Sequence, residues 1–365
     1  MKQGINFETL ARKAYANAKH SEDFIVDGEQ LVMANENELA LLPKQREVSA
    51  PSCFAHNHKM LSTMHDNLSL RLGIPKAYYR RMQNENPELL CTNVNTWLVN
   101  SGKHMIRTIQ NDDNDIIPKG HYARALLSDR YRRIDNDQVL AGLMNKVSET
   151  DFKVNSCQIT ETNMFLKINF PFAQAEVAKG DIVESGVVIK NSEVGFGACS
   201  VSLFVQRLVC TNGMVLPESL YQAKKYHAGP RQIADQDYKI VSERTKNLED
   251  QAFLSSLHDV IDTARNEKTI INIANKFKQA SADVLSGDYV ETTERLSKRL
   301  LINQNEQTSV LEHFLTSGDF SRWGFANAVT RTAQDIESYD RASELEKIGG
   351  QVIEMQSSEF MSLAA

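Results

Sequence analysis

The spacing of apolar residues changes along the chain, and the first stretch with a clear period is helical. From His56 to Leu72 apolar side chains recur every three or four positions, which predicts a helix that ends at Gly73 and Pro75. A second short helix is expected around residues 78–82. The N-terminal region is therefore predicted to be helical, and the proline-containing stretch at residues 43–52 is interpreted as a connector.

The middle of the chain follows the two-residue period of β-strands. Residues 163–170 alternate, and residues 186–190 and 198–209 are rich in side chains that favour strands. In the last of these segments, alternate residues from Cys199 to Val205 share one face. Short strands with little helix between them predict an antiparallel sheet within residues 106–216.

Beyond residue 240 glycine and proline are sparse, and the helical period returns. Four segments carry apolar stripes at this spacing, at residues 248–264, 270–285, 310–315 and 323–336. The sequence thus predicts an α+β fold, mainly an antiparallel sheet core with a helical N-terminal region and a helical C-terminal third. Three parts are expected: an N-terminal segment and connector (1–52), an α+β core domain with the sheet (53–235) and a helical C-terminal region (236–365).

Composition indicates a globular protein. Of the 365 residues, 41% are hydrophobic and 24% are charged. No apolar run approaches the roughly 18 residues of a membrane helix, and no secretory segment is recognised at the N-terminus. The five cysteines form no C-x-x-C pair, which argues against a disulfide framework or a zinc ribbon. We therefore expect a cytoplasmic protein in a reducing environment.

The charge is distributed unevenly. The chain has a net charge of −6, but residues 71–133 contain eleven basic and six acidic side chains, a local excess of +5. Aromatic residues are interleaved with these cations, a combination that holds phosphates and stacks on the bases of single-stranded nucleic acid. A solvated helix face with a few core tyrosines would produce the same pattern. The residues predicted to make these contacts are Arg124, Arg130, Arg132 and Arg133 for phosphates and Tyr131 for stacking.

Motifs of common enzymes and cofactor sites are missing. There is no phosphate-binding P-loop, no H-E-x-x-H and no G-x-S-x-G. The segment Gly195–Ser200 (GFGACS) lacks the third glycine of a dinucleotide loop and leads into another strand, which predicts a tight turn. His56, His58 and His65 have no companion ligand except Asp66, so a polar helix face is the simpler interpretation. We predict no cofactor, no metal and no catalytic residue.

A buried charge is expected at the end of the predicted sheet. Extending the phase of the strand places Arg207 on its inward face, where a guanidinium needs a partner, and Glu193 on a neighbouring strand is the candidate. A structural ion pair is the simpler account, and an active carboxylate is the alternative. Asn212-Gly213 predicts a turn after this strand. Cys210 is expected to be a buried thiol.

Several segments together resemble one family. They are Leu127–Arg132 (LSDRYR), Asn191–Gly195 (NSEVG), Arg207–Gly213 (RLVCTNG), Trp323-Gly324 and Asn327–Thr330 (NAVT). In this order they resemble a family of phage, prophage and plasmid proteins known as domain of unknown function 932, over about residues 55–335. The resemblance implies a mobile-element protein without an agreed activity, encoded among replication and recombination functions. The motif residues expected to hold the sheet core together are Asn191, Glu193, Gly195, Arg207, Asn212 and Gly213.

These observations lead to one leading hypothesis and two alternatives. The first is a non-enzymatic phage-type protein that forms homo-oligomeric rings or filaments and binds single-stranded DNA or RNA, with a role in annealing or recombination. Its partners would be further copies of itself and the nucleic acid, and no membrane. The second is an oligomeric scaffold that interacts with host proteins, for example in host defence, and binds no nucleic acid. The third is a metal-dependent hydrolase or nuclease that uses Glu193 with Asp129 or Asp135.

Overall fold

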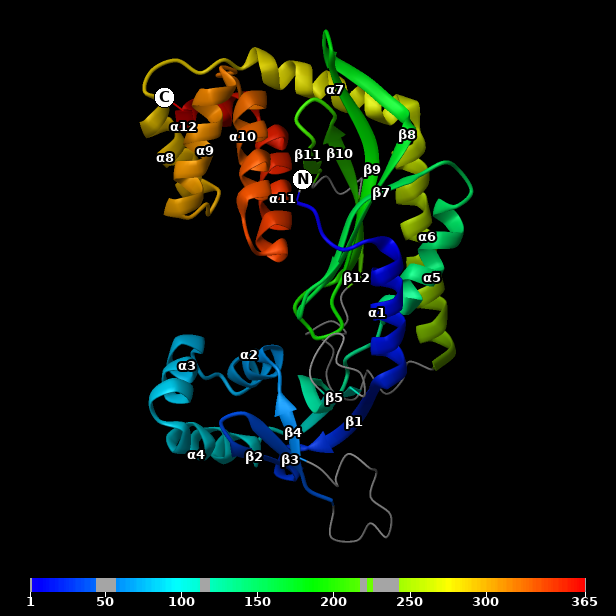
Figure 1. Cartoon of the computed structure of the whole chain (residues 1–365), viewed down its shortest axis with the longest axis vertical. Helices are drawn as coiled ribbons and strands as arrows, with labels where there is room; N and C mark the ends of the chain where they lie inside the picture. Colours follow the sequence, from blue (N-terminus) through cyan, green and yellow to red (C-terminus); the bar gives the residue numbers. More distant parts are fainter. Residues whose placement is uncertain (1, 44–56, 112–118, 217–221, 226–242, 365) are drawn as a thin grey trace.

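Two six-stranded β-sheets lie one above the other along the long axis of the molecule, and each is covered by helices (Figure 1). The computed structural model describes residues 2–43, 57–111, 119–216, 222–225 and 243–364. We call the sheet formed by β1 to β6 sheet I and the sheet formed by β7 to β12 sheet II. The α+β class predicted from the sequence is confirmed.

Sheet I forms the smaller end of the molecule. Its strand order is β1-β5-β6-β4-β3-β2, and all neighbours are antiparallel except β4 and β6, which run parallel. The helices α2 to α4 pack on it over an apolar cluster that includes Leu39, Leu68, Leu90 and Ile106. Its strands are β1 (Ser21–Asp27), β2 (Leu31–Asn35), β3 (Glu38–Leu41), β4 (Asn57–Met60), β5 (Lys103–Asn111) and β6 (Gly120–Ser128). Its helices are α2 (Ser62–Arg71), α3 (Lys76–Glu85) and α4 (Pro87–Leu98).

Sheet II is entirely antiparallel and carries the larger core. Its order is β11-β10-β9-β8-β7, and β12 pairs with β10 beside β11. Because side chains alternate along a strand, Leu166, Ile189 and Val201 all point to one face, which α6 and α7 cover. The strands are β7 (Lys153–Ile159), β8 (Met164–Ala178), β9 (Asp181–Asn191), β10 (Cys199–Arg207), β11 (Asn212–Val215) and β12 (Gln222–Lys225). The covering helices are α5 (Asn136–Val147), α6 (Glu243–Arg265) and α7 (Glu267–Ala282).

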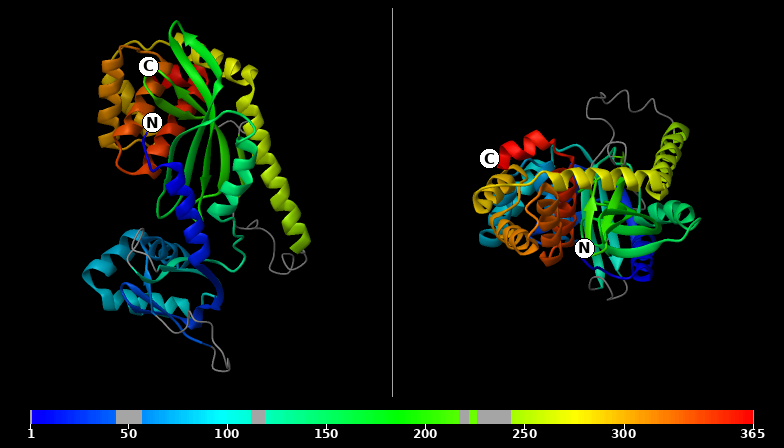
Figure 2. Two further views of the ribbon diagram at one scale, coloured as in Figure 1. Left: turned by 45° about the vertical axis from the view of Figure 1, so that its right-hand side comes forward. Right: turned by 90° about the horizontal axis from the view of Figure 1, so that it is seen from above.

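A group of helices gathers beside sheet II, as both views in Figure 2 show. Within this group α11 contacts β11 and places Tyr339 against Phe165 on the second face of sheet II, with the ring centres 5.2 Å apart. Polar caps fix where these helices begin and end: Asn303 and Glu306 form a capping box at the start of α9, and Gly318 ends it with a φ of 65°. The group consists of α8 (Tyr289–Arg299), α9 (Gln304–Ser317), α10 (Arg322–Asp335), α11 (Tyr339–Glu354) and α12 (Ser357–Ala364).

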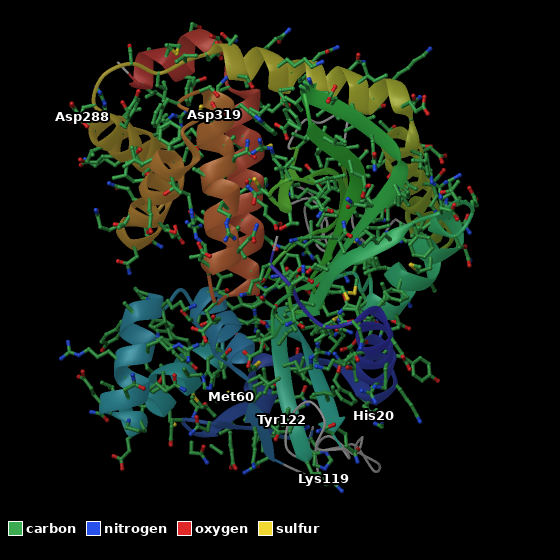
Figure 3. The ribbon with its side chains drawn as sticks, turned by 45° about the horizontal axis from the view of Figure 1, so that its top comes forward. His20, Met60, Lys119, Tyr122, Asp288 and Asp319 are labelled. Atoms are coloured by element: carbon green, nitrogen blue, oxygen red, sulfur yellow. The ribbon has the colours of Figure 1, made fainter. Side chains whose placement is uncertain are left out.

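The chain passes between the two sheets at α1 and again after β6. Helix α1 (Phe7–His20) packs against α5 and β7 and then continues directly into β1 of sheet I. Figure 3 shows His20 at the end of α1 that leads into sheet I, where Met60 and Tyr122 also lie, whereas Asp288 and Asp319 mark the helical group at the opposite end. The residues that follow β6 lead back to α5 beside sheet II.

Several element predictions are confirmed, and three need correction. Residues 57–60 form β4 and not the first turn of a helix, because they pair with β3 and β6, and the helix begins at Ser62. The short strands β1 to β3 were not predicted. Residues 106–216 contribute to two sheets and not to one, since β5 and β6 belong to sheet I.

The predicted turn lies a few residues earlier than expected, and the predicted domain boundaries fall outside the described residues. The turn after β10 is formed by residues 208–211, and Asn212-Gly213 already begin β11. The boundaries at residues 52 and 235 lie outside the described residues, so the three-part division stays a prediction.

Candidate functional site

One set of motif residues meets at the junction between the two sheets, around Arg107 of β5. The Arg107 side chain is only 2% exposed. Its guanidinium donates to Asp23 Oδ1 at 2.8 Å, to Asp135 Oδ1 at 2.7 Å and to the main-chain oxygen of Glu193 at 2.9 Å. Burial acts to lower the pKa of Arg107, but the surrounding carboxylates outweigh this effect and raise it above its ordinary value. Arg107 therefore stays charged and ties β1 and β5 to the segments that follow β6 and β9.

The Glu193 carboxylate is buried at the same junction, and donors engage both of its oxygens. Oε2 accepts from Arg124 Nη2 at 3.0 Å, and Oε1 accepts from the main-chain N–H of Asn136 at 2.8 Å. The predicted pair of Glu193 with Arg207 is wrong, because Arg207 lies opposite Val183 at the far end of β9. Both carboxylate oxygens of Glu193 accept hydrogen bonds, one from an arginine and one from a backbone N–H. Glu193 therefore stabilises the junction and has no oxygen left to bind a metal ion, which argues against the metal-dependent hydrolase hypothesis.

Three further motif residues complete this junction. The Asn191 side chain donates to the main-chain oxygen of residue 134 at 2.9 Å, and the Tyr131 hydroxyl donates to that of residue 192 at 3.0 Å. Gly195 has a φ of 86°, and a Cβ at this position would lie 2.6 Å from Leu127 Cδ2. The motifs LSDRYR and NSEVG are thus parts of one interlocked structural unit.

The residues predicted to contact nucleic acid do not form an open surface. Arg124 is bound to Glu193 inside the junction, and Tyr131 is 8% exposed, so its ring offers no face on which a base could stack. Both side chains are buried because β6 lies in the middle of sheet I and the segment after it is covered by the loop after β9, so their contact with nucleic acid stays a prediction that the burial does not favour.

The other three predicted arginines lie nearer the surface, but two are held in ion pairs. Arg132 pairs with Glu249 and Arg133 pairs with Asp23, both at 2.8 Å. Arg130 is half-buried. The structure therefore does not bring these cations together into a continuous track.

The remaining motif residues form a second polar junction, between sheet II and the helical group. Arg207 donates through Nε and Nη2 to the two carboxylate oxygens of Asp181 at 2.6 and 2.9 Å. Its guanidinium also lies 5.5 Å from the centre of the Trp323 ring. Asn212 Nδ2 donates to the main-chain oxygen of Asn327 at 3.2 Å. The inward orientation predicted for Arg207 is correct, but its partner is Asp181.

The surroundings of this second junction are closely packed. A Cβ on Gly213 would lie 2.4 Å from Phe204 Cζ, so a side chain is not accommodated there. The cavity beside Arg207 and Trp323 has room for about one water molecule, too little for a substrate. Cys210 is exposed, contrary to the prediction, because residues 208–211 form the surface turn between β10 and β11.

A different group of polar side chains lies on the second face of sheet II. Residues paired directly across neighbouring strands share a face, and one such row crosses five strands. Its members are Gln158 (β7), Phe165 (β8), Lys190 (β9), Ser200 (β10) and Lys224 (β12). We call these residues the lysine row. The two lysines lie two strands apart, which places them about 10 Å from each other.

The lysine row differs from the neighbouring part of the same face, which α11 closes. Lys167 and Glu346 lie there as a fully buried ion pair with an N–O distance of 2.5 Å. Lys224, in contrast, is exposed, and Lys190 is partly exposed. Phe165 in the middle of the row is buried under Tyr339 of α11, so a ligand can approach this face at the two lysines and not along the whole row.

Lys190 has no neutralising partner within the described residues. Its ammonium lies 5.2 Å from the centre of the Phe165 ring and makes neither a hydrogen bond nor an ion pair with any described side chain. Burial lowers the pKa of Lys190; Asp340 and Glu344 of α11 oppose this effect, while Lys347 and Lys224 add to it. A cation held in this way is available to an anionic ligand.

Asn163, immediately before β8, provides an unpaired acceptor close to Lys190. Its side chain is buried, with 6% exposure, and Nδ2 donates to Asp340 Oδ1 at 2.6 Å. Its Oδ1 has no hydrogen-bond partner. A Cβ on Gly197 would lie 3.0 Å from this Oδ1 and 3.6 Å from Lys190 Cε, so the two groups flank the same glycine.

Clusters of other chemistry are missing from the part of the chain that the structure describes. There, no group of three or more His, Cys, Asp or Glu side chains is arranged to hold a metal ion. Among the helices of these residues, none combines the length and the apolar character needed to cross a membrane.

Sequence reasoning missed Lys190, Asn163 and Arg107. For Lys190 a signal existed, because it ends the predicted strand 186–190 in the phase opposite to Val187 and Ile189. Asn163 and Arg107 carried no comparable signal, since their roles depend on segments far apart in the sequence.

Together, the two sheets and their polar junctions define an α+β protein whose characteristic motifs hold its parts together. The chain matches the family described as Domain of unknown function (DUF932) over residues 124–344, more than half of its length, and it belongs to this family. The match begins in β6, includes all of sheet II and ends within α11. No curated protein and no solved structure matches the chain.

Proposed function

We propose that this protein is a non-enzymatic, homo-oligomeric protein that binds single-stranded nucleic acid, and that the lysine row on sheet II forms its contact surface. The observation that supports this proposal is the state of Lys190, which lacks a carboxylate partner among the described residues, whereas Arg124, Arg132 and Arg133 are ion-paired. A phosphate group would supply the missing anion.

The shape of the surface also suits a single strand better than a duplex. The lysine row lies on one face of a sheet and follows its hydrogen-bonding direction, with serine and glutamine side chains beside the cations. Single-strand binders track the unpaired backbone with positively charged groups and need no regular double helix. The family resemblance, which implies replication and recombination functions in phages and plasmids, supports the same assignment.

Homo-oligomerisation follows from the small number of cations in one copy. Two lysines provide few phosphate contacts, and the acidic chain as a whole repels a polyanion. Several copies on one strand would add their contacts, and the second binding event would then be intramolecular. Light scattering of the purified protein, alone and with a long oligonucleotide, checks this part of the proposal.

Fluorescence anisotropy with a labelled 30-nucleotide oligo(dT) tests the binding surface. The double variant Lys190→Met with Lys224→Met keeps the aliphatic stems but removes both charges. We expect its affinity to fall about tenfold at low salt, and the slope of log K against log salt to decrease by about 1–2. Lys298→Met, on the exposed and distant helix α8, is the matched control and should bind like the wild type.

The same assay separates this proposal from the surface predicted from sequence. Arg130→Ala with Arg132→Ala should leave the affinity almost unchanged if the lysine row is the contact surface. A large loss of affinity in this arginine variant, with no loss in the lysine variant, would show that the contact surface is the one predicted from sequence near β6. Absence of any binding at low salt, together with a defined assembly by light scattering, would favour the oligomeric scaffold.

A further inference from the structure

Lys190 has the surroundings of a reactive amine. Its Nζ lies 5.2 Å from the centre of the Phe165 ring and forms neither an ion pair nor a hydrogen bond with any residue that the structure describes. The side chain is partly exposed, so a small reagent can reach the amine. Lysines that are held against apolar groups and beside other cations act as nucleophiles in many proteins, because the neutral amine is favoured there.

The charges around Lys190 come from two elements. Burial is the largest effect on the pKa of Lys190 and lowers it below its ordinary value. On α11, Asp340 and Glu344 oppose this effect and Lys347 adds to it, and Lys224 on β12 adds to it as well. At neutral pH the amine is therefore deprotonated in a larger fraction of the molecules than the amine of a fully exposed lysine.

The same place attracts an anionic reagent. Lys224 is exposed and lies about 10 Å from Lys190, two strands away on the same face, so both cations draw a phosphate toward this end of the sheet. In an acyl phosphate the carbonyl carbon is bonded to a phosphate oxygen. Attack by the neutral amine forms a C–N bond and breaks that C–O bond, inorganic phosphate leaves with the electron pair, and one amine proton passes to water.

We propose that Lys190 is a site of acylation by acyl phosphates, and that this modification lowers the affinity of the lysine row for nucleic acid. The amide that forms carries no charge, so the acyl group removes one of the two cations of the row. The effect on nucleic-acid binding rests on the proposed function, whereas the reactivity of the amine does not.

Acetyl phosphate, incubated with the full chain at neutral pH, is the probe, and peptide mass spectrometry measures the acetylation rate of each lysine. Lys179, exposed in the turn between β8 and β9, is the reference, and Lys167, fully buried in its ion pair, reports whether the protein stays folded. We expect Lys190 to react about threefold faster than Lys179, because its larger neutral fraction outweighs its lower nucleophilicity. This difference should disappear near the ordinary pKa of lysine.

Lys224→Met tests the contribution of the neighbouring cation. The variant removes a charge that disfavours protonation of Lys190 and attracts the acyl phosphate. Acetylation of Lys190 should therefore slow about twofold, as expected for two charges about 10 Å apart in water, while the rate at Lys179 is unchanged. Lys298→Met, on the distant helix α8, is the matched control and should change neither rate.

The effect on binding is measured by anisotropy with labelled oligo(dT) before and after acetylation. The affinity of the wild type should fall about threefold, which is the share of one of two cations. Lys190→Arg keeps the charge but has no amine to acetylate, so the same treatment should lower its affinity less.

The outcomes separate the modification site from the proposed function. If Lys190 reacts no faster than Lys179, or if Lys224→Met does not slow it, the modification site is refuted while nucleic-acid binding stands. If the wild type and Lys190→Arg lose affinity equally on acetylation, the regulatory role of Lys190 is refuted. If the untreated protein does not bind oligo(dT) at low salt, the proposed function itself fails, and the acetylation rates still decide the modification site.

Discussion

The buried pair of Arg124 and Glu193 should be a main support of the junction between the sheets, and Glu193→Gln tests this. Glutamine keeps the shape of the side chain but removes its charge. In the wild type the carboxylate accepts from Arg124 Nη2 at 3.0 Å and from the Asn136 main-chain N–H at 2.8 Å, with side-chain exposures of 3% for Glu193 and 10% for Arg124. A glutamine amide has only one oxygen, so one donor would face its NH₂ group.

The expected loss follows from the burial of the remaining cation. Removing one partner of a buried ion pair costs about 3–5 kcal/mol, because the other charge is left without compensation. Ser21 Oγ, which accepts from Arg124 Nη1 at 3.2 Å, stays as a neutral acceptor and keeps the loss near the lower end of this range. For a chain of this length, each kcal/mol lowers the midpoint of thermal unfolding by about 1.3 °C, which predicts a decrease of about 4–6 °C.

Differential scanning calorimetry measures this decrease, and Glu85→Gln provides the matched control. The pair of Arg81 and Glu85 has side-chain exposures of 71% and 63%, so the same chemical change should cost at most about 0.5 kcal/mol there. The double variant Arg124→Met with Glu193→Gln removes the buried cation as well and should recover about half of the lost stability. Equal effects of Glu193→Gln and Glu85→Gln, or no recovery in the double variant, would refute the reasoning.

Three further predictions concern single side chains. Burial lowers the pKa of His65 from 6.5 to about 4, so as the pH falls the unfolded chain takes up a proton at this residue before the folded protein does. The free energy of unfolding should therefore fall by about 2–3 kcal/mol between pH 7 and 4.5. In urea unfolding, His65→Gln should lack this part of the pH dependence. Gly195→Ala should lose about 1–3 kcal/mol in thermal unfolding, because alanine is strained at a φ of 86° and its methyl group would overlap Leu127. The exposed thiol of Cys210 should react with a disulfide reagent in the native protein, whereas Cys199, whose pKa burial raises to about 12, should react only after unfolding.

Much of the larger sheet and of the helical third could be predicted, because their patterns are local. The strands β8, β9 and β10 carry a two-residue alternation, and α6, α7 and α10 carry a helical stripe, so that one face of each must be buried whatever it packs against. Residues 57–60 form a strand and not the predicted helix, because their conformation does not depend on a local pattern. Their conformation is set by pairing with β3 and β6, which no periodicity within four residues can reveal.

The candidate site was less predictable than the fold, because partner choice depends on the tertiary structure. The sequence indicated that Arg207 must be buried with a carboxylate, but it did not show that β9 places Asp181, at its start, beside Arg207 and carries Glu193, after its other end, away from it. It also showed a basic segment around Arg124, without showing that β6 runs through the centre of a sheet.

By itself, then, the sequence determined the α+β class, the family and the presence of buried charges, since these follow from local periodicity, from short motifs and from the need of an inward guanidinium for a partner. Only the tertiary structure decided which carboxylate serves which arginine, and which cation is left without one. The local sequence placed Lys190 on the face opposite to Val187 and Ile189, but it did not show whether Lys190 or Arg124 has a carboxylate partner. One faces a buried glutamate across the junction between the sheets, and the other lies over an aromatic ring on a face that a ligand can approach.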